Sequence, residues 1–387
     1  MNRKRRQWLG VAWLVFTVLL VSHPQATYSA THQALALWWQ VVLPGLLPFL
    51  IASSLLGRLG MIALIGRWLE PLTRRLFNLP GTAALVIVLG YSSGPPVAAA
   101  MVAELRRRRL CTPREGERLL CFTHNASPLF LLAAVPVGML GDASLGVPLA
   151  AAHYCANLIL GLLWRRYGGA RPTRQPQASP FPTRSVPGAV SAEAPMAALL
   201  AEAVTQAFRT LLLVAGYMTL AAVALALLRE TGGLGPLARA FGALLALFSL
   251  PPSLGEAVTE GLVEMTLGTS RACQSSAPLG DRLTVASMIL GWSGLSVHGQ
   301  VASVLAGTDL RLGPYLLSRI AQGLLAAVLI RLWLPEAVPT FQLPRPATWS
   351  PLLVFELSLL LLGLGLALWL LLALLFALFR RSWYGGL

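Results

Sequence analysis

Four short runs of small and polar residues interrupt otherwise apolar stretches, and they hold most of the side chains that could do chemistry. The runs are Gly90 to Pro96, His124 to Pro128, Gly261 to Gly268 and Gly291 to Gln300. A break of this kind at membrane depth exposes backbone N–H and C=O groups, each of which costs roughly several kcal/mol if it stays unpaired. The breaks must therefore face protein, water or a ligand, and we expect them to meet in one central polar site.

The residue types in these runs fit the recognition of a small anion. Pro96 and Pro128 stand where a half-helix could begin, because a proline at a helix start lacks only an N–H that has no helical partner anyway. The positive end of such a helix suits a carboxylate or another anion. The predicted substrate-binding residues are Gly90, Ser92, Ser93, Gly94, Pro95, His124, Asn125, Ser127, Pro128, Glu264, Thr266, Ser293, Ser296, His298 and Gln300.

The polar side chains of this set divide by chemistry. The donors to an anion are Asn125, Ser92, Ser93, Ser127 and Ser293. Glu264, His124 and His298 could instead carry a coupling proton, since ionisable groups inside a membrane mark ion pathways. The alternative is that the small residues only allow close helix packing and the polar residues only satisfy the broken backbone.

The composition places these breaks in a membrane. Hydrophobic residues make up 56% of the 387 residues, charged residues 12%, and the mean hydropathy is +0.68. A soluble fold could not bury so much apolar surface, so the sequence predicts an all-α polytopic membrane protein in contact with lipid. The net charge of +15 comes almost wholly from arginine, without the aromatic and basic interleaving of a nucleic-acid binder. Four scattered cysteines give no metal-ligand spacing, and we expect no cofactor or metal.

Residues 33 to 165 and 204 to 331 have the order and spacing of two copies of one unit. Arg58 aligns with Arg229 at an offset of 171, and Glu117 aligns with Asp281 at an offset of 164. The expected regions are 1–30 as an N-terminal anchor, 31–165 as the first membrane repeat, 166–195 as a cytoplasmic linker, 196–333 as the second repeat, and 334–387 as an external loop with a C-terminal transmembrane helix.

The arginines predict that the two repeats have opposite orientations. Residues 58 to 79 and 104 to 118 hold four and six arginines, whereas the matching stretches of the second repeat hold two each. Arginine-rich loops stay in the cytoplasm, so the second repeat is inserted upside down. Residues 79 to 103 begin and end among these charges and predict a re-entrant hairpin. We expect two re-entrant hairpins, about eight crossings, and cytoplasmic N- and C-termini.

Other segments admit two interpretations. The basic N-terminus and its apolar run from Trp8 to Val21 fit a signal peptide or, as we prefer, a retained anchor, followed by an external loop from His23 to Gln33. Residues 58 to 77 have helical apolar spacing and predict a helix in the interface or a connector packed on its neighbours. Arg319 and His153 are equivalent in the last helix of each repeat, and either could face the cavity. Arg319 could equally reach the membrane surface or pair with Asp309.

Two other function classes are consistent with parts of the pattern. Gly90 to Gly94 fits G-x-S-x-G, and Gly291 to Gly294 resembles the G-x-S-G of rhomboid-type intramembrane proteases. The strand-turn-helix context and a well-placed acid are missing, and His298 follows Ser293 in the same broken segment, so an enzyme is not expected. A scaffold for other membrane proteins is the second alternative, because broken helices could serve assembly alone.

Several motifs, in this order, resemble the YlbJ-like sporulation integral membrane proteins. They are Pro44-Gly45-Leu46-Leu47-Pro48-Phe49, Leu69-Glu70-Pro71, Leu79-Pro80-Gly81, Gly90-Tyr91-Ser92-Ser93-Gly94-Pro95-Pro96, Glu117-Arg118-Leu119-Leu120, Asn125-Ala126-Ser127-Pro128-Leu129-Phe130 and Gly291 to Gln300. The resemblance covers most of residues 34 to 333. It differs at Pro95, where the family has tyrosine, and at Trp292, where the family has a small residue.

The resemblance implies the nucleoside-recognition or gate domain, also found in concentrative nucleoside transporters, and a role in an endospore-forming bacterium. A relative in this group is linked to dipicolinate movement toward the spore. We therefore expect a cell-membrane permease for a small organic anion, with a nucleoside transporter as an alternative. The expected partners are the anion and membrane lipid, not nucleic acid, and a homo-oligomer is left open.

Overall fold

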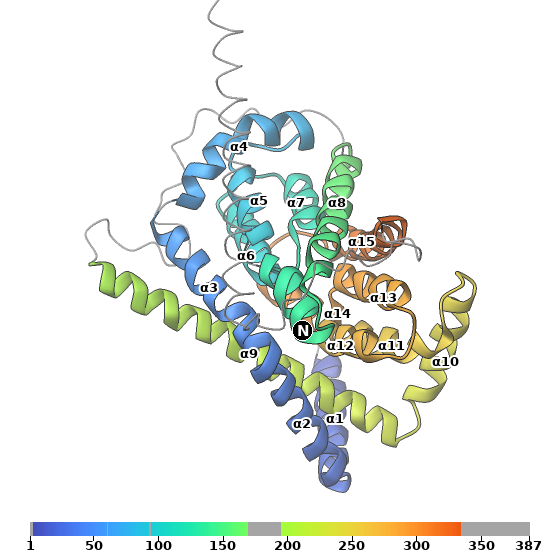
Figure 1. Cartoon of the computed structure of the whole chain (residues 1–387). Coiled ribbons are helices and arrows are strands. Elements are labelled where there is room, and N and C mark those ends of the chain that lie inside the picture. The colour runs from blue at the N-terminus through green and yellow to red at the C-terminus, as the bar shows by residue number, and fades with distance from the viewer. Residues whose placement is uncertain (1–2, 60, 93, 169–194, 334–387) are drawn as a thin grey trace, which may run out of the picture. The chain divides into compact units, whose positions relative to one another are not determined.

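The structure, a computed structural model, describes residues 3–59, 61–92, 94–168 and 195–333. Every regular element within those ranges is a helix (Figure 1). The predicted linker and the predicted C-terminal helix, from Leu352 to Phe379, fall largely or wholly outside these residues. The description below concerns the unit from Met1 to Pro335.

The chain begins with two helices, α1 (Arg3–Ser22) and α2 (Pro24–Leu37). A π-helical turn, η1 (Trp38–Val42), joins α2 to α3 (Leu43–Arg58), and Pro24–Leu56 forms one apolar span of 33 residues. The external loop expected at His23 to Gln33 is wrong, because this segment is helical. It contains no glycine, and its one proline occupies the first helical position, where proline is tolerated.

Helix α4 (Met61–Phe77) confirms the helix expected at residues 58 to 77. Its Thr73 and Phe77, four residues apart, are buried, whereas Leu64 and Trp68 are exposed. The buried face packs against α5 (Ala83–Ser92), as Figure 1 shows at the top of the view. This packing gives α4 a neighbour on one side and an apolar surface on the other.

The first predicted hairpin is present as α5 followed by α6 (Pro95–Arg107). The two helices contact each other, and the chain turns between them at Gly94, whose φ of 87° lies in the region that glycine favours. Helix α6 begins at Pro95, one residue before the start expected at Pro96, and a proline is tolerated at either of these first helical positions.

The first repeat ends with a broken helix and an intact one. Helix α7 (Pro113–Thr123) starts at a capping box between Thr112 and Glu115. Residues 124 to 127 are not helical, and the chain continues as the π-helix η2 (Phe130–Met139). A short turn, η3 (Ala143–Leu145), then leads into α8 (Gly146–Trp164).

The second half repeats this succession of a long helix, a short helix, a hairpin, a broken helix and a long helix. Its elements are α9 (Met196–Glu230), α10 (Leu234–Ala246), η5 (Pro252–Leu254), α11 (Gly255–Val263), α12 (Met265–Gln274), α13 (Leu279–Trp292), α14 (Gly294–Leu305) and α15 (Leu312–Trp333). The predicted all-helical fold with paired hairpins and broken helices is confirmed.

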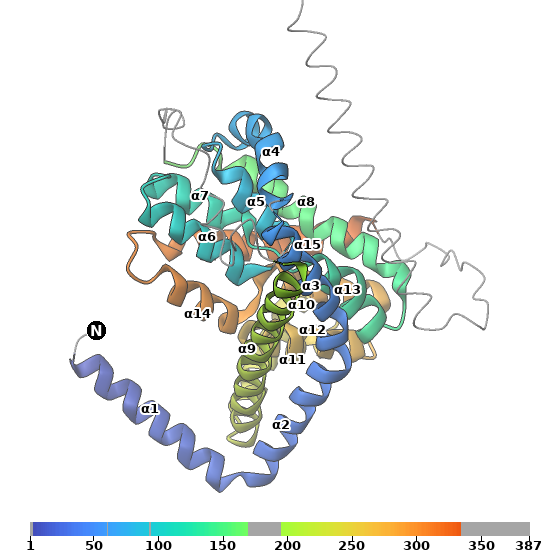
Figure 2. The same ribbon diagram turned by 90° about the vertical axis from the view of Figure 1, so that its left-hand side faces the viewer.

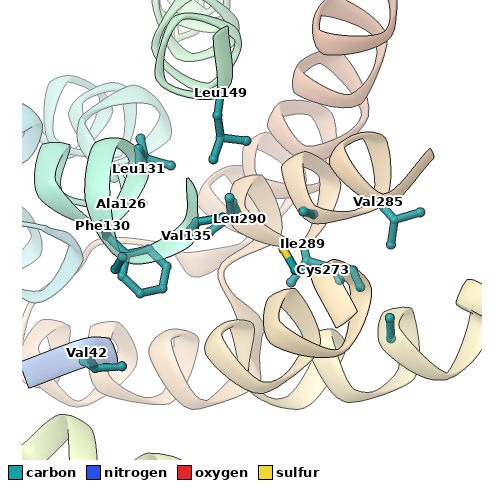
Figure 3. Close-up of a cluster of buried hydrophobic side chains, with 14 of the residues drawn as sticks. Val42, Ala126, Phe130, Leu131, Val135, Leu149, Cys273, Val285, Ile289 and Leu290 are labelled. Carbon is teal, nitrogen blue, oxygen red and sulfur yellow. The ribbon is translucent and has the colours of Figure 1, made fainter. Parts of the chain in front are cut away.

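The core joins the two halves. One cluster contains Phe130 and Val135 of η2 together with Val285 and Leu290 of α13, as Figure 3 shows. Helices α2 and α3 run along α9, a contact visible in Figures 1 and 2. Helix α15 packs against α13, α8 and α7, so it touches both repeats.

Four helical segments of the described residues are long and apolar enough to cross a membrane. They are Pro24–Leu56, Ala143–Trp164, Met196–Glu230 and Leu312–Trp333. The protein is an integral membrane protein by this composition, and the shorter helices of the hairpins and breaks lie between its spans in the sequence.

Candidate functional site

The break after α7 carries several buried polar side chains. Residues 124 to 127 are not helical, although the Ser127 carbonyl accepts from the N–H groups of Phe130 and Leu131. His124, Asn125 and Ser127 are all buried. Ser127 begins the next segment, because its side-chain oxygen accepts from the N–H of Phe130 at 3.4 Å. The other exposed backbone groups need partners from outside the segment.

Helix α8 supplies several of those partners. The Nδ2 atom of Asn157 donates to the His124 carbonyl at 3.2 Å, and the Tyr154 hydroxyl donates to the Ala126 carbonyl at 3.2 Å. The N–H of Ala126 donates to Nε2 of His153 at 3.2 Å. These contacts bind the break along one face of α8.

Arg319, on α15, supplies further donors to this region. Its guanidinium donates to the carbonyls of Cys121 and His124, which lie at the C-terminal end of α7. It also donates to Oδ1 of Asn157 at 3.0 Å and to the side chain of Gln322. A positive charge is favourable at a helix C-terminus, where the carbonyl groups leave a partial negative charge.

The charge of Arg319 is buried without a carboxylate. Its relative exposure is 0%, and none of the described Asp or Glu residues bonds to it. The alternative of a pair with Asp309 is wrong, since Asp309 accepts from Arg106 at 2.7 and 2.9 Å. The alternative that Arg319 reaches the membrane surface is also wrong, because its side chain has no exposed surface. Arg319 and its equivalent His153 both lie in the buried interior, and the hydrogen-bond partners of Arg319 are all neutral.

Several polar atoms around Arg319 have no hydrogen-bond partner among the described residues. They are Nε of Arg319, Nδ2 of Asn125, Nδ1 of His124, Nδ1 of His153 and Nε2 of His298. The Tyr91 hydroxyl faces Asn125 without reaching hydrogen-bond geometry. Buried polar groups are almost always paired in proteins, so this concentration points to a place where water or a ligand completes the bonding.

A chain of side chains links this break to α14. Nδ1 of His298 lies 2.9 Å from the Tyr315 hydroxyl, which lies 3.1 Å from Nε2 of His124. Tyr315 and Arg319 are four residues apart on α15, and the guanidinium carbon lies 5.7 Å from the centre of the tyrosine ring. The first and second repeats therefore meet through α15 at this point.

The breaks of the second repeat are shorter than expected. Between α11 and α12 only Glu264 is non-helical, so Gly261 and Thr266 lie on helices. Between α13 and α14 the chain turns at Ser293, whose φ is 76°. His298, Ser296 and Gln300 consequently lie on α14 and not in an unwound segment, because Gly294 and the residues after it resume helical bonding at once.

Glu264 has the geometry of a helix cap. Its carboxylate accepts from the N–H of Leu267 at 2.8 Å and from the Thr266 hydroxyl at 3.1 Å. A Cβ on Gly294 would lie 3.1 Å from Cα of Glu264, so the two breaks of the second repeat touch. Glu264 and Thr266 therefore fit the alternative stated in the sequence analysis, that the polar residues only satisfy the backbone groups of the broken helix.

The structure thus unites only part of the predicted set. His124, Asn125 and His298 belong to the Arg319 cluster, and Gly90 borders it, because a Cβ there would lie 2.1 Å from the Thr123 carbonyl. Ser92 and Ser293 donate within their own helices. Gly94 and Pro95 form the hairpin turn, Ser127 and Pro128 restart the helix after the first break, and Ser296 and Gln300 are partly exposed. Ser93 lies outside the described residues.

The sequence analysis missed several residues of this cluster. They are Tyr154, Asn157, Tyr315, Ser318 and Gln322, with Arg319 left open. A usable signal existed, since Tyr315, Ser318, Arg319 and Gln322 recur every three or four residues on an otherwise apolar helix. That spacing puts them on one face.

Comparison with known proteins agrees with this architecture. The model of the gate family, described as nucleoside recognition, matches residues 39–143. The sporulation integral membrane protein YlbJ of Bacillus subtilis (strain 168) is 39% identical over 348 residues, which are 87% of this chain and 85% of YlbJ. The chain belongs to the YlbJ family. The membership expected from the sequence motifs is confirmed, and with it the link to sporulation.

Several solved structures have a fold similar to that of this YlbJ-family chain. CNTnw in an inward-facing substrate-bound state has a TM-score of 0.54 at 16% identity, and an intermediate state has 0.57 at 15%. CNTnw in an outward-facing state has 0.51 at 14%. In each case the match covers 86% of this chain and 87% of the other. The YlbJ-family chain therefore shares the fold of a protein solved in both inward- and outward-facing states.

Proposed function

We propose that the protein is a secondary transporter of a small organic anion, with dipicolinate or a related carboxylate as its substrate. The observation that carries the proposal is the guanidinium of Arg319, fully buried beside a broken helix with only neutral partners. A transporter needs a site at membrane depth where a substrate replaces contacts that the protein leaves incomplete.

Electrostatics favour an anion at this place. Taking a single charge out of water costs about several kcal/mol even after the surroundings relax, and neutral hydrogen bonds offset only part of that. Helix-end carbonyls lower the cost for Arg319 but bring no full negative charge. A carboxylate arriving beside the guanidinium would supply that charge, so the site stabilises an anion more than a neutral molecule.

The unpaired atoms suit the same ligand. Nε of Arg319 and Nδ2 of Asn125 are donors without acceptors among the described residues. Carboxylate oxygens accept two or more hydrogen bonds each, and a guanidinium can bind them in a bidentate manner. Asn125 and Arg319 are held by the same residue, Asn157, which keeps both donors on one side of the break.

The family and the fold supply the setting. Membership in the YlbJ family supports a role in a membrane during sporulation, and a carboxylate carried across that membrane is the substrate class we propose. The arginine-rich loops support cytoplasmic N- and C-termini. Alternating access would come from the hairpin elements of one repeat moving against the rest, as in other transporters with inverted repeats.

The sharpest test places a carboxylate of the protein itself beside Arg319. The variant Asn157→Asp keeps the shape of the side chain and places a carboxylate 3.0 Å from Nη2 of Arg319. We expect dipicolinate uptake into proteoliposomes to fall at least about tenfold, because the new carboxylate competes with the substrate. Thermal stability should change little, because the new ion pair offsets the loss of the hydrogen bonds that Nδ2 of Asn157 donates to the His124 carbonyl and to Asn125. Gln206→Glu, on an exposed face of α9, is the control for added negative charge and should leave uptake unchanged.

Competition then tests the substrate class. Unlabelled dipicolinate and other aromatic carboxylates should reduce uptake of the labelled compound, whereas nucleosides should not. Uptake by Asn157→Asp equal to that of the unaltered protein would show that Arg319 does not bind the substrate. Competition by nucleosides alone would move the assignment to a nucleoside transporter.

A further inference from the structure

Two histidines from different broken helices are joined through one tyrosine hydroxyl. His298 belongs to α14 of the second repeat and His124 to the break of the first, and the Tyr315 hydroxyl lies 2.9 Å and 3.1 Å from their ring nitrogens. Tyr315 has no exposed surface, and both histidines are buried. A continuous hydrogen-bonded path therefore crosses from one repeat to the other through buried side chains.

The chemistry of the three groups allows only two neutral arrangements. A phenol has one proton, and a neutral imidazole has one N–H and one bare nitrogen. In the first arrangement, His298 Nδ1–H donates to the phenol oxygen and the phenol donates to His124 Nε2. In the second, both bonds are reversed. Both histidines carry the proton on Nδ1 in the first arrangement and on Nε2 in the second.

The two ends of the path are unpaired. Nε2 of His298 and Nδ1 of His124 are buried and make no hydrogen bond with any described residue. In each arrangement one of these nitrogens is a bare acceptor and the other bears a proton. A path with an acceptor at one end and a donor at the other can take up a proton and release another.

We propose that His298, Tyr315 and His124 form a proton relay that couples proton movement to the proposed anion transport, on which this inference rests. A proton adds to Nε2 of His298, whose Nδ1 proton passes to the Tyr315 oxygen. The phenol proton passes to Nε2 of His124, and the proton on His124 Nδ1 leaves. One proton enters and one leaves, so the relay ends neutral.

Each passage reverses the relay. After one proton has crossed, both histidines carry their proton on Nε2, and the path accepts the next proton only from the His124 end. Net movement in one direction therefore requires both rings to return to the Nδ1–H tautomer without a proton passing back through Tyr315, which happens when the site opens and water reaches both nitrogens of each ring. This property suits a transporter, because it limits the relay to one proton for each conformational cycle.

The groups around the relay connect it to the anion. On α15, Arg319 lies beside Tyr315, while His153 of α8 and Cys121 of α7 are the other titratable groups that face the chain among the described residues. Glu264 is engaged by its own helix cap. The positive charge of Arg319 opposes an added proton on either histidine, and a bound anion offsets that charge. Anion and proton should therefore favour each other's binding, by the reciprocity of linked equilibria.

Trp292 gives the entrance a cover. Its ring lies 4.3 Å from the ring of His298, centre to centre, and its Nε1–H donates to the carbonyl of Leu262 on α11 at 3.1 Å. A displacement of the second hairpin would draw Trp292 with it and expose His298. The free nitrogen would then reach water in only part of the cycle.

The test uses the full chain in liposomes that contain a pH-sensitive dye. With an inward proton gradient, wild-type protein should accumulate labelled dipicolinate at least about tenfold above the level without a gradient, with acidification of the interior. Tyr315→Phe should bring accumulation down to the level without a gradient, a larger loss than its loss of exchange of labelled for unlabelled anion. His298→Gln, which retains hydrogen bonding without taking up a proton, should show the same larger loss of gradient-driven accumulation than of exchange. Tyr217→Phe on α9 is the control. Full gradient-driven accumulation by Tyr315→Phe and His298→Gln would overturn the relay.

Spectroscopy tests the proton relay independently of whether the protein transports an anion. Nitrogen-15 spectra of histidine-labelled protein distinguish the two neutral tautomers. His124 and His298 should share one tautomer, or exchange between the two together, and Tyr315→Phe should abolish that correlation. Unlike or independent tautomers in the wild-type protein would overturn the relay. Absence of dipicolinate uptake by the wild-type protein, with correlated tautomers, would refute the proposed substrate and leave the relay supported.

Discussion

The broken helices of the two repeats solve the same backbone problem in different ways. In the first repeat, residues 124 to 127 stay open, and α8 and α15 must bind their carbonyl and amide groups. In the second repeat, the chain turns at Ser293 and closes at Gly294, with φ values of 76° and 81°. A left-handed residue followed by glycine restores helical bonding within one turn, so few groups remain for a ligand.

This difference suggests that the two breaks have different roles. The open break collects Arg319, Asn157 and His153, and with them the unpaired donors that suit an anion. The closed break brings the second hairpin against α14, where Glu264 caps its own helix. We infer that the first break binds and that the second break moves, with α15 and its Tyr315 connecting them.

Loss of Arg319 should separate the two regions most strongly. Arg319→Gln removes the cationic donor to the carbonyls of Cys121 and His124, which then keep only their neutral donors from Ser318 and Asn157, and a hydrogen bond to a charged group is worth about 1.5–3 kcal/mol. We expect uptake to fall to background and the melting temperature to drop. Arg271→Gln is the matched change on α12, at the second hairpin, where the arginine is half-exposed and pairs with Glu260. Its cost should be below that of Arg319→Gln, and equal costs would contradict the comparison.

Close backbone contacts provide a second test. A Cβ on Gly90 would lie 2.1 Å from the Thr123 carbonyl, so Gly90→Ala must push the first hairpin from the α7 break at a cost of about 1–3 kcal/mol. Gly294→Ala meets atoms at 3.0 to 3.1 Å and adopts an unfavourable φ, which costs about 1–2 kcal/mol. Melting temperatures measure both effects.

Gly216→Ala is the control for these glycine variants. It lies on α9 with nothing within 4 Å of the added atom, so the helix should gain about 0.5–1 kcal/mol. A larger loss for Gly294→Ala than for Gly90→Ala would mean that the second break is the more rigid of the two regions.

The sequence predicted the elements better than the site. Repeated order, helix length and the arginine bias depend on neighbours in the chain and on lipid, so α4, both hairpins and both broken helices were expected at their places. The loop at His23 to Gln33 was wrong, because a polar segment without glycine was read as a connection. The tautomeric path through Tyr315 was not expected at all, since it depends on α15 meeting residues almost two hundred positions away.

The extents of the breaks explain the errors in the site. Glycine and serine mark a break but not its length, and the second repeat needs only Glu264 and Ser293. Arg319 was recognised as equivalent to His153, yet its partners could not be predicted from the sequence. Every residue has a backbone carbonyl, so residue types do not indicate which carbonyl accepts a hydrogen bond. Only the packing of α15 on α7 shows that Arg319 binds a helix end and not Asp309.

A smaller effect is expected at the cap of the second hairpin. Glu264→Ala removes the acceptor for Leu267 N–H and should cost about 1 kcal/mol of stability, as at other helix caps. Glu264→Gln retains an acceptor oxygen and should cost less. Uptake of dipicolinate should persist in both variants if the first break is the binding region. Loss of uptake by Glu264→Gln with an unchanged melting temperature would place substrate at the second hairpin.

The smallest effect is expected at the surface, where Arg106 at the end of α6 pairs with Asp309 in the loop before α15. Hydrogen bonds from Arg106 hold the pKa of the Asp309 carboxyl below its ordinary value. The lowered pKa means that the pair stabilises the folded protein at neutral pH, and that this stability is lost as the pH falls through the folded-state pKa.

Asp309→Asn should therefore lower the melting temperature slightly at neutral pH and not at strongly acidic pH, where Asp309 is protonated in the folded protein as well. Thermal unfolding across that pH range, with the unaltered protein beside it, measures the difference. Since an exposed pair is screened by water and salt, added salt should shrink the difference at neutral pH. A difference that is large, or that does not depend on pH or salt, would mean that this rim contact holds the two repeats together as firmly as the buried Arg319 cluster does.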